Sequence, residues 1–343
     1  MVQAPRSSAT VDNIPWVEKY RPKTLDDVIS QEGIITTLSK FVSENKLPHL
    51  LFYGPPGTGK TSAILAIAKT LFPPEQFPSM VLELNASDDR GINIVREQIM
   101  NFARTSTLKS PQTKHPKLII LDEADAMTKD AQSALRRVIE KFTDNVRFCI
   151  ICNYLSKIIP AIQSRCTRFR FAPLSEDQVL PRLQHIVEEE SLTMTKDGQK
   201  ALLHLSQGDM RRVVNVLQST AMAFDKITAH NVYLCVGQPT PSDAENIMKI
   251  LLNDSIELAF IRINEMRLQS AFAVSDILTA VYHSVCGLDL PSDVLALLLD
   301  RLSEIEYRLS QGCSERVQLG ALIGLFIEAR SMLGKHAPPL NIS

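Results

Sequence analysis

The first half of the chain alternates short, nearly continuous apolar runs with longer segments whose apolar residues recur at helical spacing. Continuous apolar runs are typical of parallel strands that are buried on both faces. Strands that alternate with helices predict an α/β domain built on a parallel sheet. The expected strands are residues 49–54, 80–86, 117–123, 147–153 and 167–171.

The pattern changes at "FAPLSEDQ" (171–178), which contains Pro173 and a helix N-cap at Ser175. Every periodic segment beyond it reads as helix, and a second break at 236–243 separates two helical groups. We therefore predict three structured parts after a disordered N-terminus at residues 1–13. They are an α/β domain at 14–173, a small helical domain at 174–237 and a helical C-terminal domain at 238–343.

The composition is that of an ordinary globular protein, with 45% hydrophobic and 22% charged residues. No apolar run approaches the about 20 residues needed to cross a bilayer, and the first residues lack the hydrophobic core of a signal peptide. We therefore expect an intracellular protein without a membrane partner. Cys149 and Cys152 have the CxxC spacing of a redox or zinc pair, but they lie in an apolar run without a second pair, which favours buried thiols.

The charge is unevenly distributed along the chain. Residues 1–173 contain 23 Lys and Arg against 17 Asp and Glu, whereas residues 174–343 contain 14 against 21. A nucleic acid would therefore meet the first half of the chain, although this excess alone is weak evidence for DNA binding.

The strongest chemical motif is "GPPGTGKT", which follows an expected strand and precedes an expected helix. In a phosphate-binding loop of this kind, glycines let backbone N–H groups turn toward the phosphates of a nucleotide. Lys60 is expected to reach the β- and γ-phosphates, and Thr61 to bind Mg²⁺. The candidate ATP-binding residues of this loop are Gly54, Pro55, Pro56, Gly57, Thr58, Gly59, Lys60 and Thr61.

A second motif, "LIILDEAD" (118–125), places two carboxylates at the carboxyl end of a buried strand, where parallel sheets bind ligands. We expect Asp122 to hold Mg²⁺ and Glu123 to orient and deprotonate the attacking water. The letters DEAD also suggest a helicase, but such helicases need a second α/β lobe and a downstream SAT motif. Here the second half is helical and the "SAT" at 8–10 precedes the loop, which excludes that class.

Asn153 and Arg211 are further candidates for the nucleotide site. Asn153 ends the fourth expected strand, where its amide could bond a γ-phosphate or water; a turn residue is the alternative. Arg211 lies in the first turn of a helix that begins at Gly208-Asp209, where a positive charge opposes the helix dipole. That position favours an anionic partner, and a surface salt bridge is equally compatible with it.

Arginines recur in "SRCTRFRF" (164–171). Taken alone, Arg165 could bind nucleic acid, seal an interface or reach an anion of another molecule, and a structural salt bridge is the commoner role. Arg168 and Arg170 alternate with phenylalanines, so we expect them on a solvated or interface face of the strand.

Together these motifs, in this order and followed by helices, resemble AAA+ ATPases of the clamp-loader family. "PWVEKYRPKTLDDVISQE" (15–32) and "LELNASDDRGI" (82–92) narrow the resemblance to eukaryotic replication factor C small subunits. The resemblance is strongest over residues 15–220 and implies an α/β P-loop AAA+ domain, a helical lid and an all-α C-terminal collar that mediates oligomerisation. It also implies that the chain binds ATP and Mg²⁺, and that it hydrolyses ATP at a rate that DNA and the clamp stimulate.

The resemblance also assigns roles to single residues. Val17 and Arg21 would lie by the adenine and the phosphates, and Val28 would close the base pocket. Asn153 would be the first sensor of the γ-phosphate and Arg211 the second, on the lid. The family further implies that Arg165 is an arginine finger acting on the ATP of the adjacent subunit.

The implied partners are the other replication factor C subunits in a heteropentamer, the PCNA sliding clamp and primer-template DNA, in the nucleus. We favour Arg90 and Arg96 as DNA phosphate contacts, with Arg136 and Arg137 as the other candidates. Two rival functions remain at this stage. One is an ATP-binding scaffold whose hydrolysis is dispensable, and the other is a homo-oligomeric AAA+ motor that remodels DNA.

Overall fold

The computed structural model describes residues 14–25, 27–29, 32–44, 46–86, 92–104 and 116–336; for residues 32, 92–96 and 334–336 it describes the backbone alone. The chain divides into two compact units. Unit 1 comprises the chain up to Met194 together with Gln199–Lys226, and unit 2 comprises Thr195–Gly198 and the chain from Ile227 onward. The boundaries of the three predicted parts stay a prediction.

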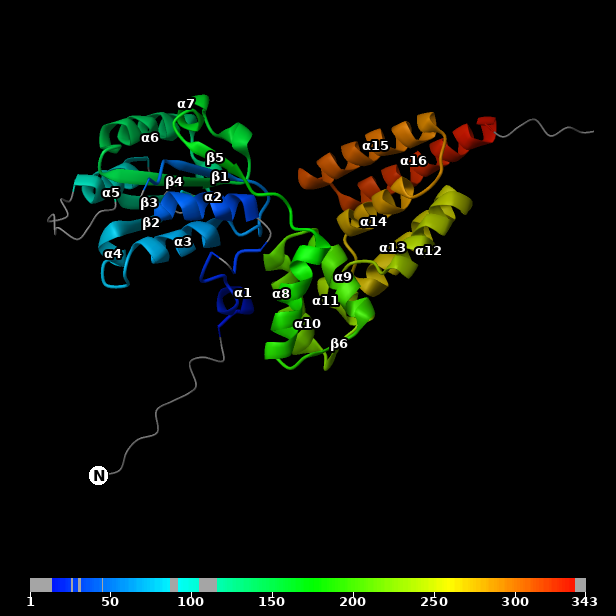
Figure 1. Ribbon diagram of the computed structural model, residues 1–343. Coiled ribbons are helices and arrows are strands. Elements are labelled where there is room, and N and C mark those ends of the chain that lie inside the picture. Colours follow the sequence, from blue (N-terminus) through cyan, green and yellow to red (C-terminus); the bar gives the residue numbers. More distant parts are fainter. Residues whose placement is uncertain are drawn as a thin grey trace, which may run out of the picture. The chain divides into compact units, whose positions relative to one another are not determined.

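Unit 1 is built on a five-stranded sheet in the order β2-β3-β4-β1-β5, and every pair in it is parallel (Figure 1). The five strands coincide with the five expected strands, which confirms the predicted α/β class. Their bounds are β1 Leu50–Tyr53, β2 Val81–Asn85, β3 Lys117–Asp122, β4 Val146–Cys152 and β5 Thr167–Arg170.

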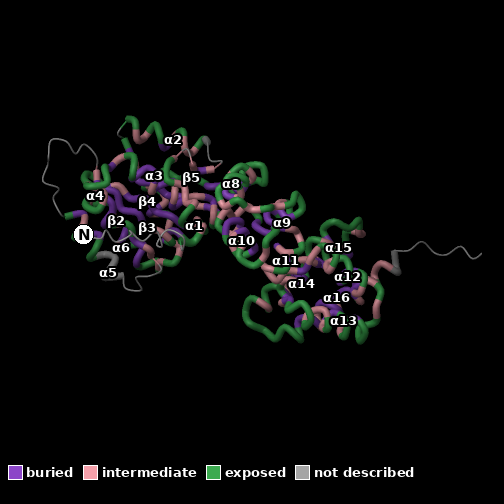
Figure 2. The backbone as a smooth tube through the Cα atoms, turned by 90° about the horizontal axis from the view of Figure 1, so that it is seen from below, coloured by how far each residue is buried: buried purple, intermediate pink, exposed green. Residues whose placement is uncertain are grey.

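Successive strand side chains enter two separate cores, because side chains alternate between the faces of a sheet. Leu50 and Phe52 pack on one face with α2 (Glu32–Ser43) and α3 (Lys60–Leu71). Leu51 and Ile150 pack on the other face with α5 (Ile92–Arg104), α6 (Lys129–Phe142) and α7 (Pro160–Gln163). Figure 2 shows the buried residues concentrated along the strands of this unit. Helices therefore cover both faces of the sheet, as predicted.

Among the described residues up to 226, the chain also forms short segments around the sheet and three longer helices. The short ones are α1 (Trp16–Lys19), α4 (Phe77–Met80) and the 3₁₀ turns Ala124–Ala126 and Leu155–Lys157. The longer ones are α8 (Glu176–Glu189), α9 (Lys196–Ser206) and α10 (Met210–Ala223). Ser175 is the N-cap of α8, as predicted, and its backbone N–H donates to Gln178 Oε1 at 2.9 Å.

The expectation that everything beyond residue 171 is helical was wrong at one place. Two strands of two residues, β6 (Thr193–Met194) and β7 (Lys226–Ile227), pair with each other. A two-residue strand is too short to produce an alternating pattern in the sequence, so its pairing depends on the folded chain.

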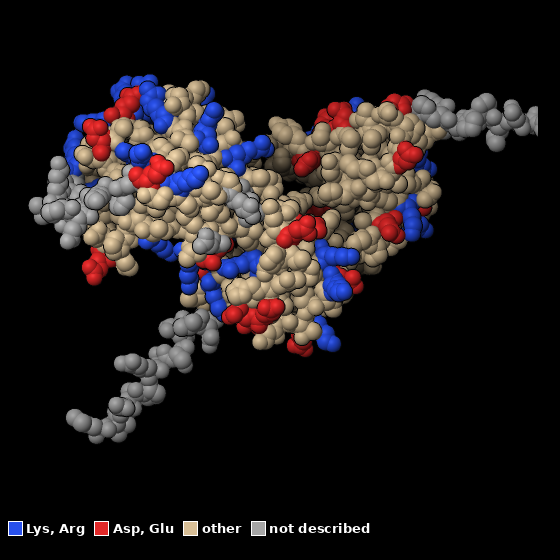
Figure 3. Space-filling model, in the orientation of Figure 1, with Lys and Arg blue, Asp and Glu red and all other residues tan. Residues whose placement is uncertain are grey.

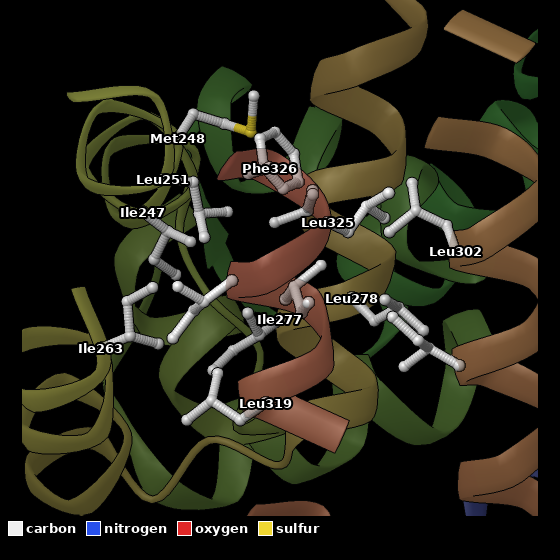
Figure 4. Close-up of a cluster of buried hydrophobic side chains, with 14 of the residues drawn as sticks. Ile247, Met248, Leu251, Ile263, Ile277, Leu278, Leu302, Leu319, Leu325 and Phe326 are labelled. Atoms are coloured by element: carbon white, nitrogen blue, oxygen red, sulfur yellow. The ribbon is translucent and has the colours of Figure 1, made fainter. Parts of the chain in front are cut away.

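Unit 2 is helical and has its own core. Its helices are α11 (Ala229–Val236), α12 (Pro241–Asn253), α13 (Ile256–Ser270), α14 (Val274–Cys286), α15 (Ser292–Ser310) and α16 (Glu315–His336). Figure 4 shows side chains of α12, α13, α14 and α15 converging on α16, where Leu319 and Phe326 are almost fully buried. Within the described part of the chain, no helix combines the length and the apolar character needed to cross a membrane.

The CxxC pair lies inside the sheet. Cys149 and Cys152 are free, buried thiols of β4, and burial raises the pKa of Cys152 to about 12. Among the described residues, no group of three or more His, Cys, Asp and Glu side chains could hold a metal ion. The interpretation as core thiols is confirmed.

Candidate nucleotide site

The loop between β1 and α3 needs glycine at three positions. Gly54, Gly57 and Gly59 have φ values of +143°, +69° and +91°, which side-chain-bearing residues rarely adopt. Space is also restricted, because a Cβ on Gly57 would lie 1.7 Å from Oδ1 of Asp209. The glycines of the sequence motif therefore follow from backbone geometry and close packing.

Lys60 lies at the start of α3 and is buried. Its ammonium group donates to the carbonyl oxygens of Gly54 and Pro55, both at 2.7 Å, and to Oδ1 of Asn153 at 3.1 Å. Burial lowers the pKa of Lys60 to about 8, while the negative charge of Asp122 opposes this shift. A cation held only by neutral oxygens in a desolvated site is better stabilised when an anion arrives.

Thr61 and Asp122 connect the two sequence motifs. The Thr61 hydroxyl donates to Oδ2 of Asp122 at 2.7 Å, and Oδ1 of the same carboxylate accepts the backbone N–H of Glu123 at 2.8 Å. Glu123 has a φ of +53°, in the left-handed region, and its side chain is exposed. For non-glycine residues this conformation is unfavourable and persists only where the surrounding structure stabilises it. Such residues cluster at functional sites.

A carboxylate that the sequence analysis did not single out fixes the end of the fourth strand. Oδ2 of Asp125 accepts the backbone N–H groups of both Asn153 and Tyr154 at 3.3 Å. The arrangement holds the Asn153 amide beside Lys60. Asp125 is the last letter of the DEAD motif, so its position in that motif was the available signal.

The glycine-rich loop borders an open pocket. Val17, Arg21 and Val28, which the family resemblance assigns to the nucleotide, line this pocket, as does Arg211. Of the loop, Gly57, Thr58, Gly59 and Thr61 line the pocket; Gly54 is buried, and Pro55 and Pro56 are exposed. The pocket is also lined by residues that no sequence motif indicated, which are Glu18, Tyr20, Pro22, Ile29, Ser62, Leu174, Arg182, Met210 and Val214.

The N-terminal segment that lines this pocket is attached to α8. Lys19 Nζ and the hydroxyl of Tyr20 each lie 2.6 Å from Oε1 of Glu190, and Arg182 donates to the Tyr20 carbonyl at 2.8 Å. These partners are more than 160 residues apart in sequence, so local patterns could not reveal the contact.

Arg211 lies in the first turn of α10, beside the loop. The helix is capped by Asp209, whose Oδ1 accepts the backbone N–H groups of Arg211 at 2.8 Å and Arg212 at 3.2 Å. No carboxylate in the described part of the chain forms an ion pair with Arg211. Its positive charge contributes to the lowered pKa of Lys60, which places its guanidinium within electrostatic range of the loop.

Arg165 follows α7 and lies outside this pocket. Its Nη2 forms an ion pair of 2.5 Å with Glu140 Oε1, and its Nη1 donates to the carbonyl of Ala161 at 2.6 Å. A salt bridge is therefore present, and it leaves the side chain 36% exposed.

The flanking strand β5 has the predicted alternation, with Phe169 and Phe171 buried and Arg168 and Arg170 exposed. Of the predicted DNA contacts, Arg90 lies outside the described residues. Arg96 lies on α5 where the backbone alone is described.

Comparisons with known proteins agree with this geometry. Residues 50–174 match the ATPase family associated with various cellular activities (AAA), and residues 239–324 match the replication factor C C-terminal domain. The Thermotoga maritima RuvB Holliday junction branch migration motor has a TM-score of 0.50 over 71% of this chain and 85% of that chain. At 16% identity this likeness shows the fold alone.

Relatives that match over most of the chain are much more similar. Replication factor C subunit 5 of Homo sapiens is 56% identical over 331 residues, which cover 96% of each chain. The probable subunit 5 of Caenorhabditis elegans is 52% identical over 98% of this chain and 93% of its own. Subunit 3 of Schizosaccharomyces pombe is 51% identical over 90% of each chain.

Within the family, the stretches "ICNYLSKIIPA", "QSRCTRFRF" and "SQGDMRRVVNVLQS" most resemble the subunit numbered five in animals and three in budding yeast. The numbering of these relatives confirms that finer resemblance. The chain therefore belongs to the replication factor C subunit family of AAA proteins, and it is an ATP hydrolase.

Proposed function

We propose that this chain is an ATPase subunit of a heteropentameric clamp loader in the nucleus. The complex uses ATP to open the PCNA clamp and to load it onto primer-template DNA for replication and repair. The observation that carries the proposal is the convergence of Lys60, Thr61, Asp122 and Asn153 at one edge of the sheet, beside a pocket. The heteropentameric assembly, the clamp and the DNA are inferred from family membership.

The loop residues and Lys60 bind the phosphates of ATP. The Lys60 ammonium exchanges its bonds to the loop carbonyls for bonds to phosphate oxygens, which are stronger because both partners are charged. Oδ1 of Asn153 lies 3.1 Å from Nζ of Lys60. Lys60 and Asn153 therefore contact the γ-phosphate together. Val17, Arg21 and Val28 contact the nucleotide from the N-terminal segment, and Arg211 contacts it from α10.

The residues at the loop also fit a magnesium ion. The Thr61 hydroxyl and the Asp122 carboxylate are hard oxygen donors 2.7 Å apart, which is the type of ligand that Mg²⁺ prefers. When bound, the ion neutralises negative charge on the phosphates.

Glu123 accepts the proton of the attacking water. Its carboxylate follows directly after the Asp122 strand end, and its left-handed backbone turns the chain away from the strand at this point. Without this base the water is a poor nucleophile, so hydrolysis depends on Glu123 while ATP binding does not.

Arg165 serves the ATP of the adjacent subunit. It lies outside the pocket of its own chain and its side chain is partly exposed, so it is available to a neighbour. A trans-acting arginine neutralises charge in the transition state and is worth about 10³–10⁵ in rate in other NTPases. Arg90 and Arg96 contact DNA phosphates.

The test is steady-state ATP turnover by the purified chain, alone and reconstituted with the other subunits, clamp and primed DNA. We expect little activity alone and a large rise on assembly, which Glu123→Gln and Arg165→Ala lower in the reconstituted complex. Arg168→Ala is the matched control, because this exposed arginine lies nearby in sequence, on β5. Rapid DNA-independent turnover by the lone chain would instead indicate a homo-oligomeric motor. Clamp loading that survives Glu123→Gln would indicate a scaffold.

A further inference from the structure

We propose that Glu140 is a positioning residue that holds Arg165 in place for the neighbouring ATP site. The inference rests on the proposed trans role of Arg165. It concerns a carboxylate on α6 to which neither the motifs nor the pocket assigns a function.

The contact between the two side chains is short and is reinforced by the backbone. Glu140 Oε1 lies 2.5 Å from Nη2 of Arg165, while Nη1 donates to the Ala161 carbonyl at 2.6 Å and to Ser164 Oγ at 3.4 Å. The guanidinium is thus held from two sides, by α6 and by the end of α7. Two anchors restrict the rotamers of a long side chain, which would otherwise lose that freedom only on meeting its target.

These anchors leave part of the guanidinium available. Arginine has five N–H donors in a planar fork. Among the described residues, the Nε–H group and the second N–H of Nη2 have no partner. An oxyanion can therefore bind Arg165 while Glu140 still holds it, so the ion pair and the trans contact are compatible.

The support behind Glu140 is rigid. α6 begins at Thr128, whose Oγ1 accepts the Ala131 N–H, and it leads from the 3₁₀ turn that follows Glu123. Gln132 of α6 is almost fully buried and bonds both the Lys157 carbonyl, at 2.9 Å, and the Ile159 N–H, at 2.8 Å, just before α7. The helix that follows the chain's own catalytic carboxylate is therefore fixed to the segment that carries Arg165.

Glu140 also compensates local positive charge. Nε of Arg136, one turn earlier on α6, lies 3.7 Å from the same Oε1 atom. In Figure 3, Lys and Arg side chains gather around α6 and α7 with acidic side chains among them. One carboxylate between two guanidinium groups lets both occupy this surface, whereas its loss would drive Arg165 away from Arg136.

The proposal has a matched control within the chain. Glu304 on α15 is also shared by two arginines, at 3.0 Å from Arg301 and 2.5 Å from Arg308, and its side chain is 41% exposed, compared with 42% for Glu140. Glu304→Gln removes the same charge and the same kind of pair at a site without an assigned catalytic partner.

The experiment compares Glu140→Gln and Glu304→Gln in the reconstituted complex with clamp and primed DNA. We expect Glu140→Gln to lower kcat about tenfold. This effect is larger than that of losing an exposed ion pair and smaller than the about 100-fold effect of misplacing a catalytic group. The KM for ATP, the nucleotide affinity of the isolated chain and the assembly of the complex should not change. Glu140→Asp, which keeps the charge, should recover part of the rate.

A double-variant test separates positioning from a structural role. In an Arg165→Ala background, Glu140→Gln should have no further effect on kcat, because the group it positions is absent. An equal loss in both backgrounds, an unchanged kcat, or a rise in DNA-independent turnover would overturn the role of Glu140 while leaving the Arg165 finger intact. An Arg165→Ala complex with unchanged turnover would overturn the finger itself, and the inference with it.

Discussion

The hydroxyl of Thr61 and the carboxylate of Asp122 meet at 2.7 Å, although the two residues are 61 positions apart in sequence. Thr61 belongs to the first turn of α3, and Asp122 is the last residue of β3. The bond joins the glycine-rich loop to the acidic motif, so that two oxygen donors lie beside the phosphate-binding loop.

Replacing Thr61 with valine should remove the dependence of nucleotide affinity on magnesium. Valine keeps the shape of threonine but lacks the oxygen, so we expect ATP turnover to fall by about 100-fold or more in the assembled complex. Thr61→Ser keeps the hydroxyl and should retain most of the activity. Nucleotide affinity, measured with Mg²⁺ and with EDTA, tests this directly. A valine variant that still gains as much affinity from Mg²⁺ as the unaltered chain would contradict the assignment.

Gly57→Ala should abolish tight nucleotide binding. The substitution forces a left-handed backbone on alanine, which costs about 1–2 kcal/mol, and its Cβ would collide with the Asp209 carboxylate that caps α10. The control is Gly33→Ala on α2, where nothing lies within 4 Å of an added Cβ. That change should be neutral or slightly stabilising. Nucleotide titration and thermal unfolding of both variants check the prediction, which equal behaviour of the two would refute.

Nucleotide binding should take up a proton at alkaline pH. In the free chain the pKa of Lys60 is lowered from 10.5 to about 8 by burial, so above pH 8 the amine is increasingly neutral. Phosphate oxygens favour the charged form, so binding restores the proton, and affinity should fall as pH rises from about 8 toward 10.5.

Calorimetry at pH 9 in buffers of different ionisation enthalpy measures this proton uptake. Lys60→Arg is the control, because a guanidinium stays protonated throughout this range and should bind nucleotide without uptake. An arginine variant that takes up the same number of protons would assign the effect to another group.

The free energy of unfolding should decrease below pH 6.5 because of His49. This histidine is buried, its Nδ1 accepts the Phe148 N–H at 3.2 Å, and burial lowers its pKa from 6.5 to about 4. The unfolded chain binds a proton near pH 6.5 and the folded chain does not, so stability is lost as pH falls from 6.5 toward 4. The full effect is about 3 kcal/mol, from about 1.36 kcal/mol per pKa unit.

Urea unfolding of the unaltered chain and of His49→Asn between pH 7 and pH 5 measures this loss of unfolding free energy. Asparagine retains a side-chain acceptor without titrating, so its unfolding midpoint should depend less on pH. Parallel pH dependences for the two proteins would rule His49 out as the cause.

The features that could be predicted from the sequence are those whose signals lie within a few neighbouring residues. Four of the five strands, β1 to β4, appear in the sequence as nearly continuous apolar runs because both faces of the sheet are covered. The glycine-rich loop is recognisable because its backbone excludes other residues at Gly54, Gly57 and Gly59. Val17, Val28 and Arg211 were assigned from the family resemblance, and the structure brings them to one pocket.

Contacts between side chains that are far apart in sequence became visible only in the folded chain. No hydrophobic periodicity in the sequence predicts such contacts. Examples are the hydrogen bond of Tyr20 with Glu190, the proximity of Asp209 to Gly57 and the ion pair of Arg165 with Glu140. Each depends on the packing of separate elements and on the rotamers of long polar side chains. Hydrophobic pattern and backbone preference act within a few residues, whereas such contacts exist only once the sheet and its helices have brought the elements together.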